Sequence, residues 1–239
     1  MIVEGAISTK AALFNGRRRV ECVYIDEDKV SRDVTYILNY LNKHDIRYQL
    51  CKREYIDSIA SGKTHGGIIA EVSSRKYDDI SKLKDRTVFL IDGVEDPFNL
   101  GYIFRTLRAF NYHQVIMPSR DLSNMESSIL KSSAGAFDEL DIIMSDDLYR
   151  DLLKLKDHYK LLSLSRSDKA KDIMTYHFPS KKIILLGGEK RGIKKDILKI
   201  SNEEIFIDYP GDFRNALNAS SALSVMTAVL EMRKRNGYD

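Results

Sequence analysis

Three segments of the chain place asparagine, arginine and glycine residues directly after apolar runs that are typical of buried β-strands. Open parallel α/β sheets bind ligands at the carboxyl ends of their strands, so these segments are the first candidates for a site. The first, residues 92–101, contains Asn99 just before a predicted helix, where its side chain can cap free backbone N–H groups. Arg105 and Arg108 follow on nearby faces of that helix. A plain helix cap followed by two surface arginines fits the same pattern.

The second segment, residues 185–193, combines Gly187, Gly188 and Gly192 with basic residues. Glycines after a buried strand let a ligand approach the backbone closely, although a tight turn would use them equally well. Their spacing is not GxGxxG, and Lys190 is not part of a Walker pattern. The segment therefore disfavours a nicotinamide or ATP site.

The third segment, residues 207–222, is predicted to run from a strand end through a turn into a helix whose first turns are small and polar. Small residues allow close packing, either against a ligand or against another helix. Taken alone, the segment leaves both alternatives open.

Around these segments, apolar residues alternate between strand and helix periodicity, which predicts an α/β protein with a parallel sheet covered on both faces. The first 80 residues form a small α/β unit, and the polar residues 73–86 are the best candidate for a linker. The predicted helices span residues 7–14, 31–43, 55–60, 102–110, 129–134 and 215–235, and the predicted strands span 20–25, 47–51, 67–72, 87–91, 115–117, 161–165 and 183–186.

Composition narrows the class of protein further. The 239 residues are 43% hydrophobic and 31% charged, which suits two globular domains. No apolar run approaches the ~18 residues of a membrane span, and no secretory pattern opens the chain, so we expect a cytoplasmic protein. Cys22 and Cys51 are expected to be buried thiols, and no His or Cys spacing suggests a metal site.

The net charge of +3 permits nucleic-acid binding. The run Arg17–Arg19 fits either a solvated turn or a phosphate contact.

Taken together and in this order, the segments resemble the SpoU/TrmH family of SPOUT methyltransferases. The DPxNxGxxxRxA motif reads Asp96 to Leu107 here, with Leu107 in place of the usual alanine. GxExxG reads Gly187 to Gly192, and SLNxSxA reads Ala216 to Ala222, with Ala216 in place of the usual serine. The SAGA marker reads 133–136. The first 80 residues look like the family's ribosomal-protein-like RNA-binding domain.

This resemblance implies a parallel α/β domain, residues 86–239, with a deep trefoil knot, preceded by a substrate RNA-binding domain, residues 1–80. It implies methylation of a ribose 2′-hydroxyl in structured RNA by S-adenosylmethionine in a metal-free homodimer, with ribosomal RNA favoured over transfer RNA. The resemblance also implies that the backbone at Gly187, Ile207 and Leu217, which correspond to cofactor-binding positions of the family, holds the adenosine part of the cofactor.

The family's functional residues correspond to Arg105, Asn99, Glu189 and Asn218 here. Arginine is a poor base, so Arg105 is expected to position the ribose or phosphate or to stabilise developing negative charge. Asn99 and Asn218 are expected to orient Arg105 by hydrogen bonds, and Glu189 is expected to accept hydrogen bonds from the asparagines or the arginine and hold them in place. Two alternatives remain: a non-catalytic RNA-binding or ribosome-assembly protein that keeps the fold, and a nucleotide-binding enzyme of the doubly wound class.

Overall fold

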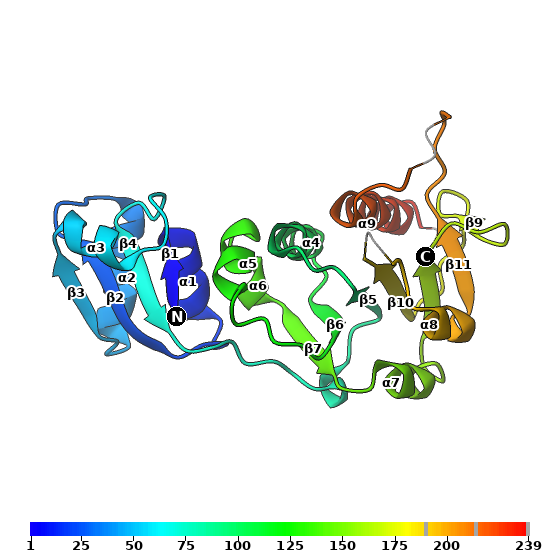
Figure 1. Ribbon diagram of the computed structural model, residues 1–239, viewed down its shortest axis with the longest axis horizontal. Helices are drawn as coiled ribbons and strands as arrows, with labels where there is room; N and C mark the ends of the chain where they lie inside the picture. The colour runs from blue at the N-terminus through cyan, green and yellow to red at the C-terminus, as the bar shows by residue number, and fades with distance from the viewer. Residues whose placement is uncertain (189–190, 213–214, 238–239) are drawn as a thin grey trace. The chain divides into compact units, whose positions relative to one another are not determined.

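The computed structural model describes residues 1–188, 191–212 and 215–237 (Figure 1). The chain consists of two compact units. The first unit contains residues 1–76 and 121–139, and the second contains residues 77–120 and those from 140 onward. Within the described residues, no helix is both long enough and apolar enough to cross a membrane.

The first unit is built on a four-stranded sheet in the order β1-β4-β2-β3, in which only β2 and β3 pair in parallel. The sheet confirms the three strands predicted for residues 1–80 and adds β1. Ser31 caps helix α2 as predicted, because its Oγ accepts the N–H of Val34 at 3.2 Å. Cys22 and Cys51 are buried thiols, also as predicted. The elements are β1 (Ile2–Glu4), α1 (Ala6–Phe14), β2 (Val20–Asp26), α2 (Arg32–Lys43), β3 (Tyr48–Cys51), α3 (Arg53–Ile59), β4 (Ile68–Val72), α5 (Glu126–Ser132) and α6 (Ala136–Glu139).

The segment 121–139 packs with residues 1–76 although it is distant in sequence. Gly135 adopts φ 89°, and a Cβ at this position would lie 2.9 Å from Cβ of Ala11 on α1. The SAGA marker, residues 133–136, therefore provides a close approach between the turn before α6 and helix α1.

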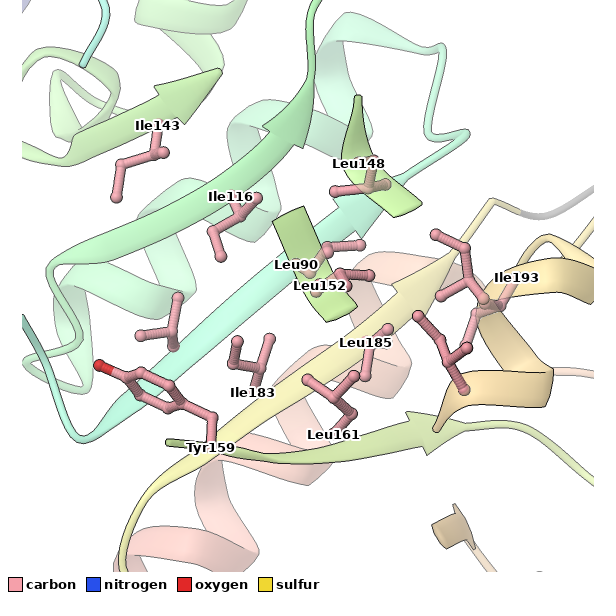
Figure 2. Packing of buried hydrophobic residues seen from close by; sticks show 13 residues of the cluster. Leu90, Ile116, Ile143, Leu148, Leu152, Tyr159, Leu161, Ile183, Leu185 and Ile193 are labelled. Atoms are coloured by element: carbon pink, nitrogen blue, oxygen red, sulfur yellow. The ribbon is translucent and has the colours of Figure 1, made fainter. Parts of the chain in front are cut away.

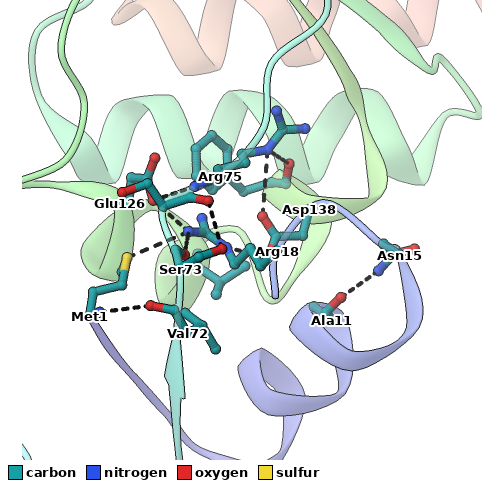
Figure 3. Close-up of polar contacts among 12 residues, drawn as sticks. Met1, Ala11, Asn15, Arg18, Val72, Ser73, Arg75, Glu126 and Asp138 are labelled. Carbon is teal, nitrogen blue, oxygen red and sulfur yellow. Dashed lines mark hydrogen bonds and ion pairs between the residues drawn. The ribbon is translucent and has the colours of Figure 1, made fainter. Parts of the chain in front are cut away.

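Four charged side chains lie inside this unit, where α5 and α6 meet the N-terminal residues (Figure 3). Arg18 donates from Nη1 to Glu126 at 2.5 Å and from Nε to Asp138 at 2.8 Å. Arg75 pairs with Asp138 at 3.5 Å, and its guanidinium lies 5.0 Å from the ring centre of Phe137. The network explains why a charged residue in the run 17–19 is buried: Arg18 is an internal ion-pair partner and no candidate for phosphate contact.

Burial and ion pairing shift the pKa values of the charged groups in this network in opposite directions. Burial lowers the pKa of the Arg18 guanidinium, but Asp138 and Glu126 raise it more, so the net shift is upward. For Asp138, burial raises the pKa of the carboxyl despite the opposing effect of Arg18 and Arg75. Each charge in this network therefore depends on its partners to offset the cost of desolvation.

The second unit contains a seven-stranded sheet in the order β7-β6-β5-β10-β8-β11-β9, and all its pairs are parallel, as predicted. Helices α4 and α9 lie on one face and α7 and α8 on the other (Figure 1). The elements are η1 (Ile80–Lys82), β5 (Thr87–Asp92), α4 (Pro97–Ala109), β6 (Gln114–Pro118), β7 (Asp141–Ser145), α7 (Leu148–Leu155), β8 (Lys160–Leu164), β9 (Lys171–Asp172), β10 (Lys182–Gly187), α8 (Lys195–Ile200), β11 (Glu203–Phe206) and α9 (Ala219–Arg235).

The core of the second unit follows from the strict alternation of side chains along its central strands. Val88 and Leu90 of β5 join Ile183 and Leu185 of β10 in one buried cluster with residues of α7 and α8 (Figure 2). The intervening residues, such as Phe89, are fully buried as well. Both faces of these strands are therefore covered, which explains why they read as unbroken apolar runs in the sequence.

Two helices begin at residues other than those predicted. Helix α4 begins at Pro97, and Asp96 caps it by accepting the N–H of Asn99 at 2.7 Å. Asn99 is consequently inside the first turn, and the prediction that it precedes the helix is wrong. Helix α9 begins at Ala219 instead of residue 215, with Asn218 as its cap. The physical reason at α4 is that proline is favoured at a first helical position and aspartate just before it.

Candidate active site

A pocket of about 370 Å³ lies at the carboxyl ends of β8, β10 and β11. Gly187, at the end of β10, and Ile207 and Leu217, both in the connection from β11 to α9, all line it. The structure therefore brings together the three residues predicted to hold the cofactor. Most lining residues are apolar or glycine; Arg166 adds a cation, and Ser165 and Tyr209 add hydroxyl groups.

Two glycines of the second motif are required by contacts between backbones. A Cβ on Gly187 would lie 2.2 Å from the backbone carbon of Gly192, and a Cβ on Gly188 would lie 1.9 Å from the backbone oxygen of Gly93. Real Cβ atoms do not approach other atoms so closely. The glycines therefore let the loops after β5 and β10 pack directly against each other and shape the pocket wall.

Tyr209 holds the connection from β11 to α9 in place, a role that the sequence analysis did not predict. Its hydroxyl accepts the backbone N–H of Leu217 at 3.0 Å, and the Arg166 guanidinium stacks 4.9 Å from its ring centre. All three residues line the pocket. No pattern in the sequence pointed to this role of Tyr209.

The two predicted asparagines are in contact. Asn218 donates from Nδ2 to Oδ1 of Asn99 at 3.2 Å, which joins the start of α9 to the first turn of α4. Thr106 and Ser224 continue the same contact between the helices, with their hydroxyls 3.4 Å apart. The asparagine pair is thus fixed by the packing of two helices.

Arg105 does not join this pair. It is exposed on α4, and six residues at 100° each place it roughly 120° around the helix from Asn99. Within the described part of the chain, no hydrogen bond or ion pair of Arg105 is recorded. Its guanidinium is therefore available to a ligand. Glu189, the fourth predicted residue, lies outside the described residues.

A second pocket, of about 430 Å³, is formed by the loop after β5 and by residues 191–194, and it shares Gly192 with the first. Asn99 also lines it. Behind the loop, Arg120 donates from Nη2 to the carbonyl of Val94 at 2.7 Å. Burial lowers the pKa of the Arg120 guanidinium, an effect that the nearby charges of Glu95 and Asp92 oppose.

Among the described residues, no three His, Cys, Asp or Glu side chains are grouped as a metal site would need.

A parallel α/β domain with a pocket at the carboxyl ends of its strands belongs to the class of folds that bind ligands at this edge of the sheet. Similar solved structures are methyltransferases. The SpoU methyltransferase AviRb from Streptomyces viridochromogenes, in complex with AdoMet, has a TM-score of 0.81 at 17% identity, over 99% of this chain and 91% of that one. An AdoMet-bound rRNA methyltransferase from Sinorhizobium meliloti has a TM-score of 0.78 at 16% identity, over 98% and 87%.

Sequence comparison identifies the family. Residues 86–228 match the model of the SpoU rRNA Methylase family, and residues 2–78 match that of the RNA 2′-O ribose methyltransferase substrate-binding domain. A similar relative is the 23S rRNA (guanosine-2′-O-)-methyltransferase RlmB of Salmonella typhimurium, 26% identical over 231 residues, which cover 94% of this chain and 95% of that protein. The chain belongs to the SpoU rRNA Methylase family. It is an RNA 2′-O-ribose methyltransferase that uses S-adenosylmethionine.

Proposed function

We propose that this chain methylates a ribose 2′-hydroxyl in ribosomal RNA in preference to transfer RNA, with S-adenosylmethionine bound in the 370 Å³ pocket. One observation carries the proposal: the end of β10 and the connection from β11 to α9 place Gly187, Ile207 and Leu217 around one pocket. The next residue after Leu217 is Asn218, which pairs with Asn99. The preference for ribosomal RNA is supported by the relative that acts on 23S rRNA and aligns with 94% of this chain.

The pocket suits the adenosine part of this cofactor. An adenine ring needs an apolar slot with a few polar groups at its edge. The pocket wall includes Leu186, Ile207 and Leu217 as apolar residues, and Ser165, Arg166 and Tyr209 as polar ones. The absence of a Cβ at Gly187 keeps the loop close to Gly192 and so preserves the slot. When bound, S-adenosylmethionine supplies an activated methyl group on a sulfonium ion.

Because the donor is already activated, the protein residues mainly align the ribose and stabilise charge. Arg105, an exposed cation, would hold the target phosphate or stabilise the negative charge that develops on the 2′-oxygen. It is a poor general base, since its guanidinium stays protonated. Asn99 and Asn218 would fix the position of α4, which carries Arg105, and Glu189 would accept hydrogen bonds from this group.

The proposed function also assigns a role to each domain of the chain. Residues 1–80 would bind the substrate RNA and residues 86–239 would carry out the transfer, in the cytoplasm where ribosomal RNA is matured. The resemblance to the family further suggests that the strand-end loops of residues 86–239 would form a deep trefoil knot. Phe98 and Tyr102, exposed on α4 beside Arg105, support a homodimer that covers this helix together with part of α9.

Transfer of tritium from labelled S-adenosylmethionine to unmodified RNA tests the function. We expect label in one ribosomal RNA species and little in transfer RNA. A 2′-O-methyl group blocks the neighbouring phosphodiester from alkaline cleavage, so the label should appear in an alkali-resistant dinucleotide. Label in a single nucleotide after alkali would indicate base methylation and contradict the proposal. Cofactor binding without transfer to any RNA, including ribosomal assembly intermediates, would favour the non-catalytic RNA-binding alternative.

Gly187→Ala tests the assignment of the cofactor pocket. The added methyl group would collide with the backbone of Gly192, so the loop must shift. Overpacking of this kind costs about 1–3 kcal/mol, and we expect the Kd for S-adenosylhomocysteine to rise about tenfold or more in titration calorimetry. Gly211→Ala is the matched control, because a Cβ there meets nothing within 4 Å. Equal affinity of the Gly187→Ala variant and the wild type would place the cofactor elsewhere.

A further inference from the structure

The proposed cofactor pocket has one charged residue in a largely apolar wall. Among the described residues that line it, Arg166 is the only one with an ionised side chain. Within the described part of the chain, no carboxylate forms an ion pair with Arg166, and its guanidinium lies over the ring of Tyr209. The side chain is exposed, so its N–H groups are accessible to a ligand. A guanidinium only donates hydrogen bonds, and an anionic group is its strongest acceptor.

Backbone contacts and one aromatic ring hold Arg166 beside the pocket. Arg166 follows the end of β8, where the backbone N–H of Ser165 donates to the carbonyl of Ile205 on β11 at 3.0 Å. The hydroxyl of Ser165 also donates to Glu204 at 2.5 Å. The guanidinium lies 4.9 Å from the ring centre of Tyr209. A guanidinium that lies over a ring keeps the N–H groups at its rim available for a planar, bidentate contact.

The charges of the cofactor differ between its parts. The adenosine part is neutral, the sulfonium and the amino group are positive, and the carboxylate of the methionine part is negative. A guanidinium repels the two positive groups, whereas it can form two parallel hydrogen bonds with a carboxylate. Of the three charged groups of the cofactor, the carboxylate alone gains free energy from a position beside Arg166.

Tyr209 connects this cation with the residues that are assigned to the adenosine. Its hydroxyl accepts the backbone N–H of Leu217 at 3.0 Å, and its ring lies under the Arg166 guanidinium. We propose that Arg166 binds the carboxylate of the methionine part of S-adenosylmethionine, and that Tyr209 positions Arg166 relative to the adenosine. The inference rests on the cofactor pocket of the proposed function and adds the residue that recognises the amino-acid end of the cofactor.

Two ligands that differ by one carboxylate test the inference. The decarboxylated analogue of S-adenosylhomocysteine keeps the adenosine, the sulfur and the amino group. In titration calorimetry, we expect wild-type protein to bind S-adenosylhomocysteine about tenfold or more tightly than this analogue, in line with the value of a hydrogen bond between charged groups. Arg166→Ala should raise the Kd for S-adenosylhomocysteine by a similar factor, whereas its Kd for the analogue should not rise. Because Arg166 is exposed, its removal should leave the fold intact.

Lys169→Ala is the matched control, because it removes an exposed cation of the same loop that does not line the pocket, and it should keep the wild-type preference. A loss of preference as large as that of Arg166→Ala would indicate a nonspecific effect of charge and contradict the inference.

Three further results would overturn the inference. An equal rise in Kd for both ligands in Arg166→Ala would place this residue at the adenosine part, and no rise for either would separate it from the cofactor. Equal affinity of the wild type for the two ligands would exclude recognition of the carboxylate, whether or not the variant folds. The proposed function would survive all of these results, and it would fail if wild-type enzyme methylated no RNA ribose.

Discussion

Replacing Arg105 by alanine is expected to reduce methyl transfer to RNA by about 100-fold or more, the effect of losing one group that stabilises developing charge. The side chain is exposed on α4 and makes no recorded hydrogen bond or ion pair with the described residues, so its removal should leave the fold intact. It does not line the proposed cofactor pocket, so the Kd for S-adenosylhomocysteine should stay within about twofold, which is a negligible free-energy change. Single-turnover transfer of tritium to ribosomal RNA measures the rate, and calorimetry measures the affinity.

Two further variants test whether the loss of activity is specific to Arg105 and to its planar guanidinium. Arg105→Lys keeps the charge but loses the planar fork, so an intermediate rate would indicate bidentate contact with the substrate. Arg150→Ala removes an exposed arginine from α7, on the opposite face of the sheet, and should retain the wild-type rate. If Arg105→Ala transferred methyl groups as fast as Arg150→Ala, the proposed role of Arg105 would have to be abandoned.

Replacing Arg18 by methionine is expected to destabilise the first unit by about 3–5 kcal/mol, the usual cost of removing one partner from a buried ion pair. The side chains of Arg18 and Asp138 are fully buried, and that of Glu126 is 2% exposed. Without Arg18, Asp138 would keep the Arg75 guanidinium at 3.5 Å, and Glu126 would keep the backbone N–H of Arg75 at 3.3 Å. For a unit of this size, such a loss should lower the midpoint of thermal unfolding by more than about 10 °C.

Arg19→Met is the matched control for this prediction. Arg19 is the next residue, but its ion pair with Glu21 is exposed on both sides and should contribute less than about 1 kcal/mol. Hydrogen exchange can locate the effect: in Arg18→Met, amides of α5 and α6 should lose protection together with those of α1. Protection that fell only in residues 1–76 would show that the network does not stabilise the packing of the segment 121–139.

Local sequence patterns predicted several elements correctly because their signals are local. Ser31 caps α2, and the apolar runs of β5, β8 and β10 give buried parallel strands. Three short elements were not predicted: β7, α7 and α8 have five, eight and six residues. Each is shorter than the window of ~11–18 residues over which a period is judged. At α4 and α9, the predicted first residues differ from the observed ones by several positions. The capping residues caused this error: Asp96 also fits the loop motif before α4, and Asn218 also fits the interior of a longer helix.

The sequence by itself determined the family and the cofactor, because the motifs that begin at Asp96, Gly187 and Ala216 occur in the order typical of the family. Only the tertiary structure decided how these residues meet. Asn99 contacts Asn218 across 119 positions, whereas Arg105, six residues from Asn99, faces elsewhere. The burial of Arg18 and the position of Arg166 over Tyr209 are likewise decided by distant partners. The sequence specifies the type and charge of each residue. The desolvation and ion pairing of a charged side chain depend on the residues that the fold places around it.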